Sequence, residues 1–181
     1  YSPVSYLPQA TSIFITRNLG CSPFYIFYFA RFFTFLFWLT TIYFSIKILP
    51  AFKWLFTLLA LLPMSLFENM SVSADVVTNA LSFFLIAYFL KCTFEEKQFT
   101  RSAFFILGLL SILLSLSKFI YCPLLLLFFM MTSKKFTGKK KYFLTGFSIL
   151  AIAATAVFCW SVMIGKLIVP YSAYNPNYRY G

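Results

Sequence analysis

The sequence predicts an all-α integral membrane protein, a polytopic transmembrane helical bundle with about six spans and one short interfacial helix. Of its 181 residues, 61% are hydrophobic, 23% are aromatic and only 10% are charged, whereas a soluble domain has about a quarter charged residues. The apolar residues form long runs, and the basic residues stand mostly between those runs, as the positive-inside rule expects. Lipid is therefore the expected solvent for much of the chain.

The composition also excludes several functional classes. The net charge of +11 does not indicate nucleic-acid binding, because the basic residues form no single patch or stripe. The sequence contains no histidine, which removes Ser-His-Asp and Cys-His catalysis and most zinc sites. The cysteines lack metal-ligand spacing and are interpreted as apolar core residues, so the residues themselves predict no metal or cofactor. They are Cys21, Cys92, Cys122 and Cys159.

The N-terminal segment, before the first long apolar run, predicts the short interfacial helix. From Gln9 onward, Ile13, Phe14 and Leu19 form one apolar side of a helix that lies on the outer surface of the bilayer. Gly20 is a suitable C-terminal cap for this helix.

Two apolar runs follow, separated by a basic turn. The first span covers Pro23 to Ile46, a run of 24 residues interrupted only by Arg31, which is long enough to cross a bilayer core. The turn Lys47–Lys53 precedes a second, shorter run from Trp54 to Phe67, whose flanking lysine can reach the interface. Pro63 is expected to kink this run near its far end.

The third span begins after a polar turn and continues to about Leu90. Ser73 is suited to cap its first turn, and Asp75 lies where a carboxylate interacts favourably with the helix dipole. Asp75 also begins a polar stripe, spaced three and four residues apart, that places its members on one helix face. We expect this stripe to face the interior of the bundle. Its other members are Thr78, Asn79 and Ser82.

The apolar stretch 102–131 is too long for one ordinary span and too short for two full ones. Lys118 and Pro123 interrupt it, so we interpret it as two short helices that meet at SKFIYCP. One long, tilted and kinked helix is the alternative. The last span runs from Tyr142 to about Val169.

The basic loops predict the orientation. Lys47–Lys53, Lys91–Arg101 and Lys134–Lys141 together hold ten of the fifteen basic residues, against two acids, Glu95 and Glu96. These loops are therefore expected on the cytoplasmic side of the plasma membrane, with both chain ends on the outer face. One long helix over 102–131 would put the most basic loop outside, which favours six spans. The lysines of these loops are interpreted as topology signals only.

Four charged residues fall in the outer half of the predicted spans, and Tyr121 completes the candidate site with them. The four are Arg31, Glu68, Asp75 and Lys118. Charges at this depth are costly, so each one is a functional hypothesis. Arg31 lies eight residues into its span, roughly 12 Å along the helix, and needs Asp75, Glu68 or a lipid phosphate as partner. The alternatives are structural: a helix-end acid at Asp75, a snorkelling Lys118, and an ion-paired Arg31.

Three segments carry a resemblance to a known family. They are SPVSYLPQATSIFITRNLGCSPFYIFYFARFFTFLF at the start, LLPMSLFENMSVSAD, and SKFIYCPLLLL. The first resembles the part of GT-C glycosyltransferases that follows their first outer loop, with Ala30-Arg31 as an "AR" pair. Together the three resemble the bacterial membrane-protein family called domain of unknown function 2142, itself similar to the GT-C enzymes. The resemblance extends to about Pro123.

This resemblance implies a GT-C-like fold and an enzyme that takes a polyprenyl-phosphate sugar donor at the outer face. In such enzymes a carboxylate of the first outer loop activates the acceptor, sometimes with a divalent metal. That loop would lie before Tyr1, so no catalytic residue is assigned in this chain. By the same analogy Arg31 and Lys118 would face the donor phosphate. The chain is expected to be one transmembrane domain, 1–181, cut from a longer protein that continues at both ends.

The function expected on these grounds is that of a membrane glycosyltransferase of cell-envelope polysaccharide synthesis. One rival is a transporter or flippase of a lipid-linked substrate, which requires polar residues through the full depth of the bilayer. The inner halves of the spans are too apolar for that. A second rival is a non-enzymatic membrane subunit, in which the outer charges would tolerate neutral replacement. The expected partners are the lipid bilayer and the lipid-linked donor.

Overall fold

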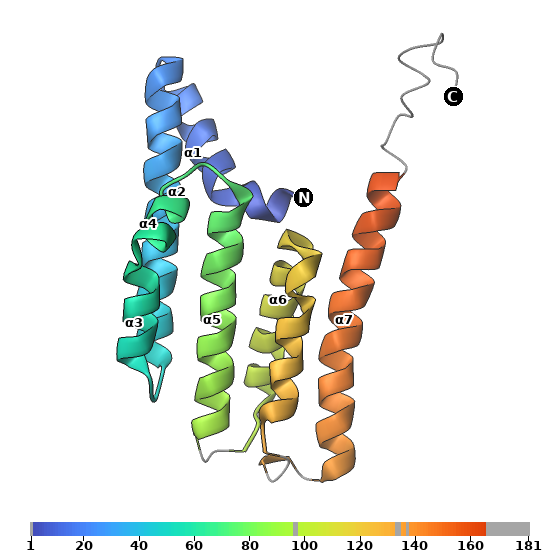
Figure 1. The fold of residues 1–181 in the computed structure, drawn as a ribbon. Helices are drawn as coiled ribbons and strands as arrows, with labels where there is room; N and C mark the ends of the chain where they lie inside the picture. The colour runs from blue at the N-terminus through green and yellow to red at the C-terminus, as the bar shows by residue number, and fades with distance from the viewer. Residues whose placement is uncertain (1, 96–97, 133–134, 137, 166–181) are drawn as a thin grey trace, which may run out of the picture.

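The computed structural model describes residues 2–95, 98–132, 135–136 and 138–165 (Figure 1). These residues are helical apart from short turns and include no strand, which confirms the all-α class. The α-helices are α1 (Leu7–Asn18), α2 (Pro23–Ile48), α3 (Lys53–Leu61), α4 (Pro63–Asn69), α5 (Ala74–Phe94), α6 (Arg101–Ser117) and α7 (Lys139–Gly165). The 3-10 helices are η1 (Pro3–Tyr6) and η2 (Phe119–Met130).

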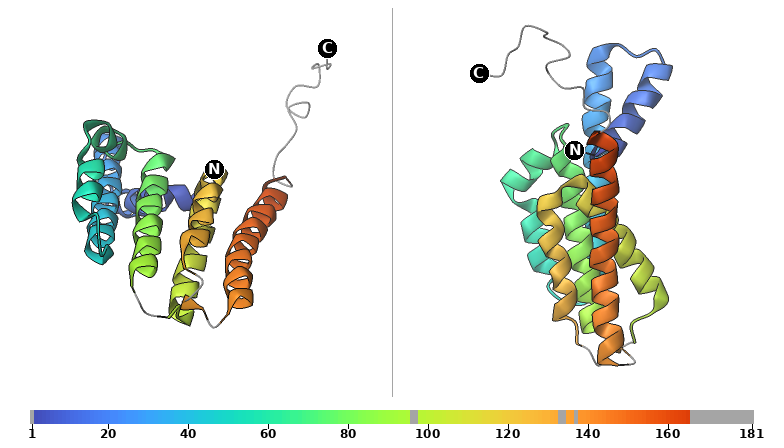
Figure 2. Two further views of the ribbon diagram at one scale, coloured as in Figure 1. Left: turned by 60° about the horizontal axis from the view of Figure 1, so that its bottom comes forward. Right: turned by 90° about the vertical axis from the view of Figure 1, so that its right-hand side faces the viewer.

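The long helices follow one another in a curved row rather than closing into a ring (Figure 2). α2 packs on α5, α5 on α6, and α6 on α7, while α2 and α7 share no contact within the described residues. α7 is consequently the most exposed of the long helices. In its apolar 18-residue segment 11% is buried, against 50% for the corresponding segment of α5 in the middle of the row. α5 is therefore the central helix around which the other elements are placed.

Among the described residues, three helices, α2, α5 and α7, are long and apolar enough to cross a membrane, and α6 and η2 are shorter apolar helices. The expected total of six spans stays a prediction. The stretch 102–131 is two helices, because Lys118 adopts an extended backbone with φ −148° and ψ 119°. After this break, Tyr121 N–H donates to the Lys118 carbonyl at 3.1 Å, the spacing of a 3-10 helix. At about 2.0 Å per residue, the 12 residues of η2 reach roughly 24 Å.

Proline 63 divides the second predicted span instead of only kinking it. Leu62, directly before it, has ψ 134°, because the pyrrolidine ring disfavours helical backbone in the preceding residue. The chain restarts as α4 with Pro63 in the first turn, where its missing N–H costs nothing. The predicted run Trp54–Phe67 is thus covered by two short helices that lie beside α2 and α5.

Gly20 ends α1 as expected. Its φ is +70°, and the two following amides bond back across the last turn, Gly20 N–H to the Arg17 carbonyl at 3.1 Å and Cys21 N–H to the Thr16 carbonyl at 3.2 Å. This pair of bonds is a Schellman motif, which requires a left-handed residue at that place. The chain then turns into α2, so α1 and α2 form a helical hairpin (Figure 2).

α1 and α2 expose most of their large apolar side chains and bury several small or polar ones. In α1 and at its C-terminal cap, Ile13, Phe14 and Leu19 are 41%, 68% and 73% exposed, while Gln9, Ser12 and Thr16 are buried. The predicted position of this helix on the bilayer surface stays a prediction. α2 likewise buries Ala30 and Thr34, and most of its phenylalanines are exposed. Small residues allow close helix approach where lipid surrounds the outside. This polarity fits a chain that is solvated by lipid.

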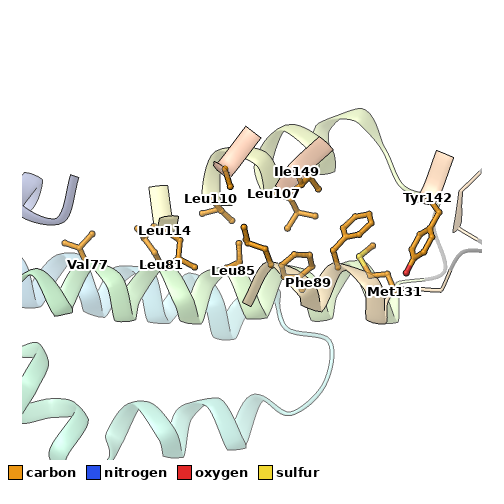
Figure 3. Packing of buried hydrophobic residues seen from close by; sticks show 13 residues of the cluster. Val77, Leu81, Leu85, Phe89, Leu107, Leu110, Leu114, Met131, Tyr142 and Ile149 are labelled. Atoms are coloured by element: carbon orange, nitrogen blue, oxygen red, sulfur yellow. The ribbon is translucent and has the colours of Figure 1, made fainter. Parts of the chain in front are cut away.

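The predicted polar stripe on α5 faces inward. Thr78 and Ser82 are buried, with Asn79 half-buried at the edge. Beside and below this stripe the interior is apolar: a row of α5 side chains packs on α6 and η2, in one cluster with residues of α7 (Figure 3). That row is Val77, Leu81, Leu85 and Phe89, and the residues opposite include Leu107, Leu110, Leu114, Leu125, Phe128 and Ile149.

The three basic loops lie at the same end of the row, the lower end in Figure 1. We call this the basic end, where α2, α5 and η2 finish and α3, α6 and α7 begin. We call the other the opposite end, where α5 begins and α6 finishes. α5 continues to Phe94, four residues beyond the predicted Leu90. Lys134, Glu96 and the predicted last residues of the final span, 166–169, lie outside the described residues.

Candidate functional site

Asp75 and Lys118 form an ion pair at the opposite end. Asp75 belongs to the first turn of α5, whose N-terminal cap is Ser73, with the Ser73 Oγ accepting from Asp75 N–H at 3.2 Å. Lys118 is the C-terminal cap of α6. Because α5 and α6 run antiparallel, the start of one helix and the end of the other meet at this end (Figure 1). Two residues 43 positions apart are thereby joined.

Each member of the pair also suits its own helix. A carboxylate stabilises a helix N-terminus and an ammonium stabilises a helix C-terminus, so Asp75 and Lys118 would each be favourable without the other. Their side chains are 36% and 23% exposed, which keeps the desolvation cost below that of a fully buried pair. The arrangement is therefore stable by itself, and a ligand is not needed to explain it.

The N-terminal segment covers this end of the row. Ser5 Oγ donates to the Ser117 carbonyl at 3.4 Å, and Gln9 Nε2 donates to the Ser73 carbonyl at 2.8 Å. Both side chains are buried, Ser5 at 0% and Gln9 at 3% exposure. The N-terminal segment thus bonds to Ser117, directly before Lys118, and to Ser73, directly before the first turn of α5. The sequence does not indicate this role, since only contacts over 64 and 112 positions reveal it.

A cavity of about 470 Å³ opens beside Lys118, between the α6–η2 junction and α7. Ser115 and Ser117 line its inner side and are buried at 3% and 1% exposure. Trp160 and Ser161 line it from α7, and the rest of the wall is apolar. The apolar residues are Leu116, Phe119, Ile120 and Val157. A cation, hydroxyls and an indole therefore face one space at the edge of an apolar wall.

Arg31 lies apart from the Asp75–Lys118 pair in the network of contacts. Its Nε donates to the Met70 carbonyl at 2.9 Å, in the turn between α4 and α5, and its guanidinium carbon lies 5.9 Å from the ring centre of Phe27. A cavity of about 250 Å³ surrounds it, lined by aromatic side chains and Met70. Neither Asp75 nor Glu68 pairs with Arg31 within the described residues, where a backbone carbonyl accepts from it. The third expected partner, a lipid phosphate, stays a prediction.

The remaining two candidates do not join the pair. The backbone carbonyl of Glu68, at the end of α4, accepts from Ser71 Oγ at 2.7 Å. The Glu68 side-chain carboxylate makes no ion pair within the described part of the chain. Tyr121 packs half-buried against the apolar core. Among the five predicted site residues, the ion pair joins the side chains of Asp75 and Lys118, and Tyr121 contacts Lys118 through its backbone N–H. Arg31 and Glu68 belong to the same end, on neighbouring elements.

The described residues contain no group of three or more Cys, Asp or Glu side chains that could hold a metal ion. The catalytic carboxylate and the divalent metal implied by the family resemblance stay expectations. No donor set for them is assigned among the side chains at the opposite end.

Lys135 has a structural role that the sequence analysis missed. Its Nζ donates to the carbonyls of Cys92 and Thr93 at 2.6 Å each and also to that of Glu95. These groups lie in the last turn and at the C-terminal cap of α5, where helix carbonyls have no partner within the helix. The interpretation of the loop lysines as topology signals only is therefore incomplete.

A family model described as "Predicted membrane protein (DUF2142)" matches residues 1–177, well beyond the Pro123 to which the resemblance was traced. Neither the curated proteins nor the solved structures include a match to this chain. The family match agrees with the three long apolar helices and the outward-facing apolar side chains of the structure. The chain therefore belongs to the DUF2142 family of membrane proteins, whose function is unknown.

Proposed function

We propose that the protein is a GT-C-like glycosyltransferase that takes a lipid-linked sugar donor for cell-envelope polysaccharide synthesis. In this proposal the opposite end of the row faces outward from the plasma membrane, and the donor phosphate binds in the cavity beside Lys118. The observation that supports it most is the composition of that cavity, where one cation and three serine hydroxyls lie against an apolar wall. This combination suits a phosphate attached to a long hydrocarbon chain.

The chemistry asked of the cation is electrostatic. When a sugar leaves a polyprenyl phosphate, negative charge grows on the phosphate oxygens, and a fixed ammonium lowers the energy of that state. Asp75 holds the Lys118 ammonium at the α5–α6 junction, so it acts in this proposal as a positioning residue. Arg31 would supply a second cation toward the neighbouring aromatic cavity.

The polarity of the interior favours this proposal over a flippase. A flippase must carry its polar headgroup across the full depth of the layer, where unsatisfied polar groups are costly. Below Ser82, the interior side of α5 continues with Leu85 and Phe89, which are buried against other apolar residues (Figure 3). The proposed polar site is thus confined to one end.

A transfer assay tests the proposal. The full-length protein is purified with the single changes Asp75→Asn, Lys118→Gln and Arg31→Gln, and transfer of labelled sugar from a polyprenyl-phosphate carrier is measured. Lys53→Gln serves as the control, because this exposed lysine lies at the basic end. We expect Lys118→Gln to lower kcat about 100-fold or more, the scale reported for one lost electrostatic group, with Lys53→Gln unchanged.

Two outcomes would contradict the proposal. Wild-type transfer in all three folded variants would show that the charges are structural, as expected of a non-enzymatic subunit. Absence of transfer by the intact protein with every carrier lipid tested would exclude the enzymatic reading itself.

A further inference from the structure

A second cavity, of about 570 Å³, lies at the basic end between the first turns of α6 and α7. From α6 it is lined by Thr100, Arg101, Phe104 and Phe105, and from α7 by Lys141, Leu144, Thr145 and Ser148. The two helices run in the same direction and pack on each other, so both N-termini point at this end (Figure 1). We propose that this cavity binds the headgroup of an anionic phospholipid.

The first argument is charge. Arg101 and Lys141 are exposed side chains that both line the cavity, and none of its described lining residues is acidic. Each helix N-terminus adds about half a positive charge. Lys135 also contributes to the lining, although its ammonium protons are directed at the carbonyls of α5. The carboxylate of Glu95 lies in the adjoining cavity and pairs with Lys91 at 4.0 Å. An anion is therefore the occupant that the charges favour.

The second argument is the apolar wall. Phe105 and Leu144 are 72% and 71% exposed, and exposed apolar side chains of this chain face lipid. They border the same cavity as Arg101 and Lys141. An acyl chain could lie along them while the headgroup phosphate meets the two cations. Basic pockets between membrane helices are known headgroup sites for anionic lipids.

The third argument is rigidity. The inner wall is an aromatic cluster, in which Phe99 stacks on Phe136 with ring centres 4.8 Å apart and meets Phe128 edge-on at 6.0 Å. The Thr100 hydroxyl caps α6 by accepting from Ala103 N–H at 3.4 Å. A preformed wall lowers the cost of ordering the site on binding. The site is separate from the cavity beside Lys118, so it does not depend on the proposed enzymatic function.

The test uses the full-length protein in detergent, with bound lipid counted by native mass spectrometry. Phosphatidylglycerol is titrated against phosphatidylcholine, whose phosphate carries no net charge. The test variant is Arg101→Gln/Lys141→Gln. The matched control is Lys139→Gln/Lys140→Gln, which removes two exposed charges beside the cavity but not from its lining. Arg101→Lys/Lys141→Arg preserves the charge and checks that the site tolerates change.

We expect wild type, the control and the charge-preserving variant to prefer phosphatidylglycerol. Arg101→Gln/Lys141→Gln should bind it roughly 10- to 30-fold more weakly, on the scale of two cations near a lipid headgroup. Equal losses in the two glutamine pairs would overturn the proposal in favour of general surface charge. Equal binding of the two lipids by wild type would also overturn it, as would complete displacement of the lipid by excess glycerol phosphate, which would indicate a site for free phosphate.

Discussion

Gly146 of α7 lies against two phenylalanine rings of η2, and replacing it by alanine gives the sharpest test of the packing. A Cβ atom there would lie 2.8 Å and 2.9 Å from two ring carbons of Phe128 and 3.1 Å from one of Phe129. Carbon atoms pack at about 3.5–4.0 Å, so the methyl group overlaps the ring by several tenths of an ångström. Phe128 is 1% exposed and cannot simply turn away.

The expected magnitude follows from two opposed terms. Overpacking of a core costs about 1–3 kcal/mol, and Phe128 is held by stacking on Tyr142 with ring centres 5.7 Å apart. Alanine in place of glycine favours the helix by up to about 1 kcal/mol. The sum predicts that Gly146→Ala lowers the free energy of unfolding by up to about 2 kcal/mol.

Gly108 supplies the matched control. It is also inside a helix, and a Cβ there would meet nothing within 4 Å. Gly108→Ala should therefore raise the free energy of unfolding by up to about 1 kcal/mol, from helix propensity alone. Both variants are compared with wild type by unfolding the purified protein in rising fractions of a denaturing detergent. An equal, stabilising effect of the two changes would refute the packing of η2 on α7.

Two further predictions concern the basic end. Lys135→Met should lower the free energy of unfolding by about 2 kcal/mol, because it removes charged hydrogen bonds from the last carbonyls of α5. Amide exchange should become faster only in that turn. Lys140→Met is the control, and equal effects of the two changes would contradict the capping role of Lys135. In a cysteine-free background, an impermeant maleimide should label Val72→Cys in intact cells and label Thr132→Cys only after permeabilisation, since the positive-inside rule puts the basic end in the cytoplasm. The reverse pattern would show that the orientation is wrong.

The features that the sequence predicts well are those set by neighbouring residues. Ser73 caps α5, Gly20 ends α1, and the break at Lys118 divides the stretch 102–131, because capping, left-handed turns and backbone interruptions depend on local chemistry. The grouping of the basic loops at one end follows from the alternation of apolar runs and turns. These are properties that a single sequence contains.

The features that it does not predict depend on which helix faces which. Nothing near Arg31 indicates that its partner is the carbonyl of Met70, 39 positions away, since any backbone carbonyl can accept. The covering role of Gln9 and the capping role of Lys135 have the same cause. Tyr121, in the 3-10 helix η2, packs against the apolar core, and this contact too depends on which helix faces which.

Hydroxyl groups buried at mid-depth bond within their own helices. Thr34 donates to the Ala30 carbonyl at 2.7 Å, Ser82 to that of Thr78 at 2.8 Å, and Ser111 to that of Leu107 at 2.7 Å. In the described part of the chain, the side-chain hydrogen bonds that connect different helices lie near the opposite end of the row, as with Gln9, or near the basic end, as with Lys135.

The helices can therefore tilt without breaking a hydrogen bond between them at mid-depth, while hydrogen bonds continue to connect their ends. A thinner or thicker bilayer is accommodated by such tilting. The row should then respond to membrane thickness by leaning as a connected whole, and the spacing of groups at each end should change least.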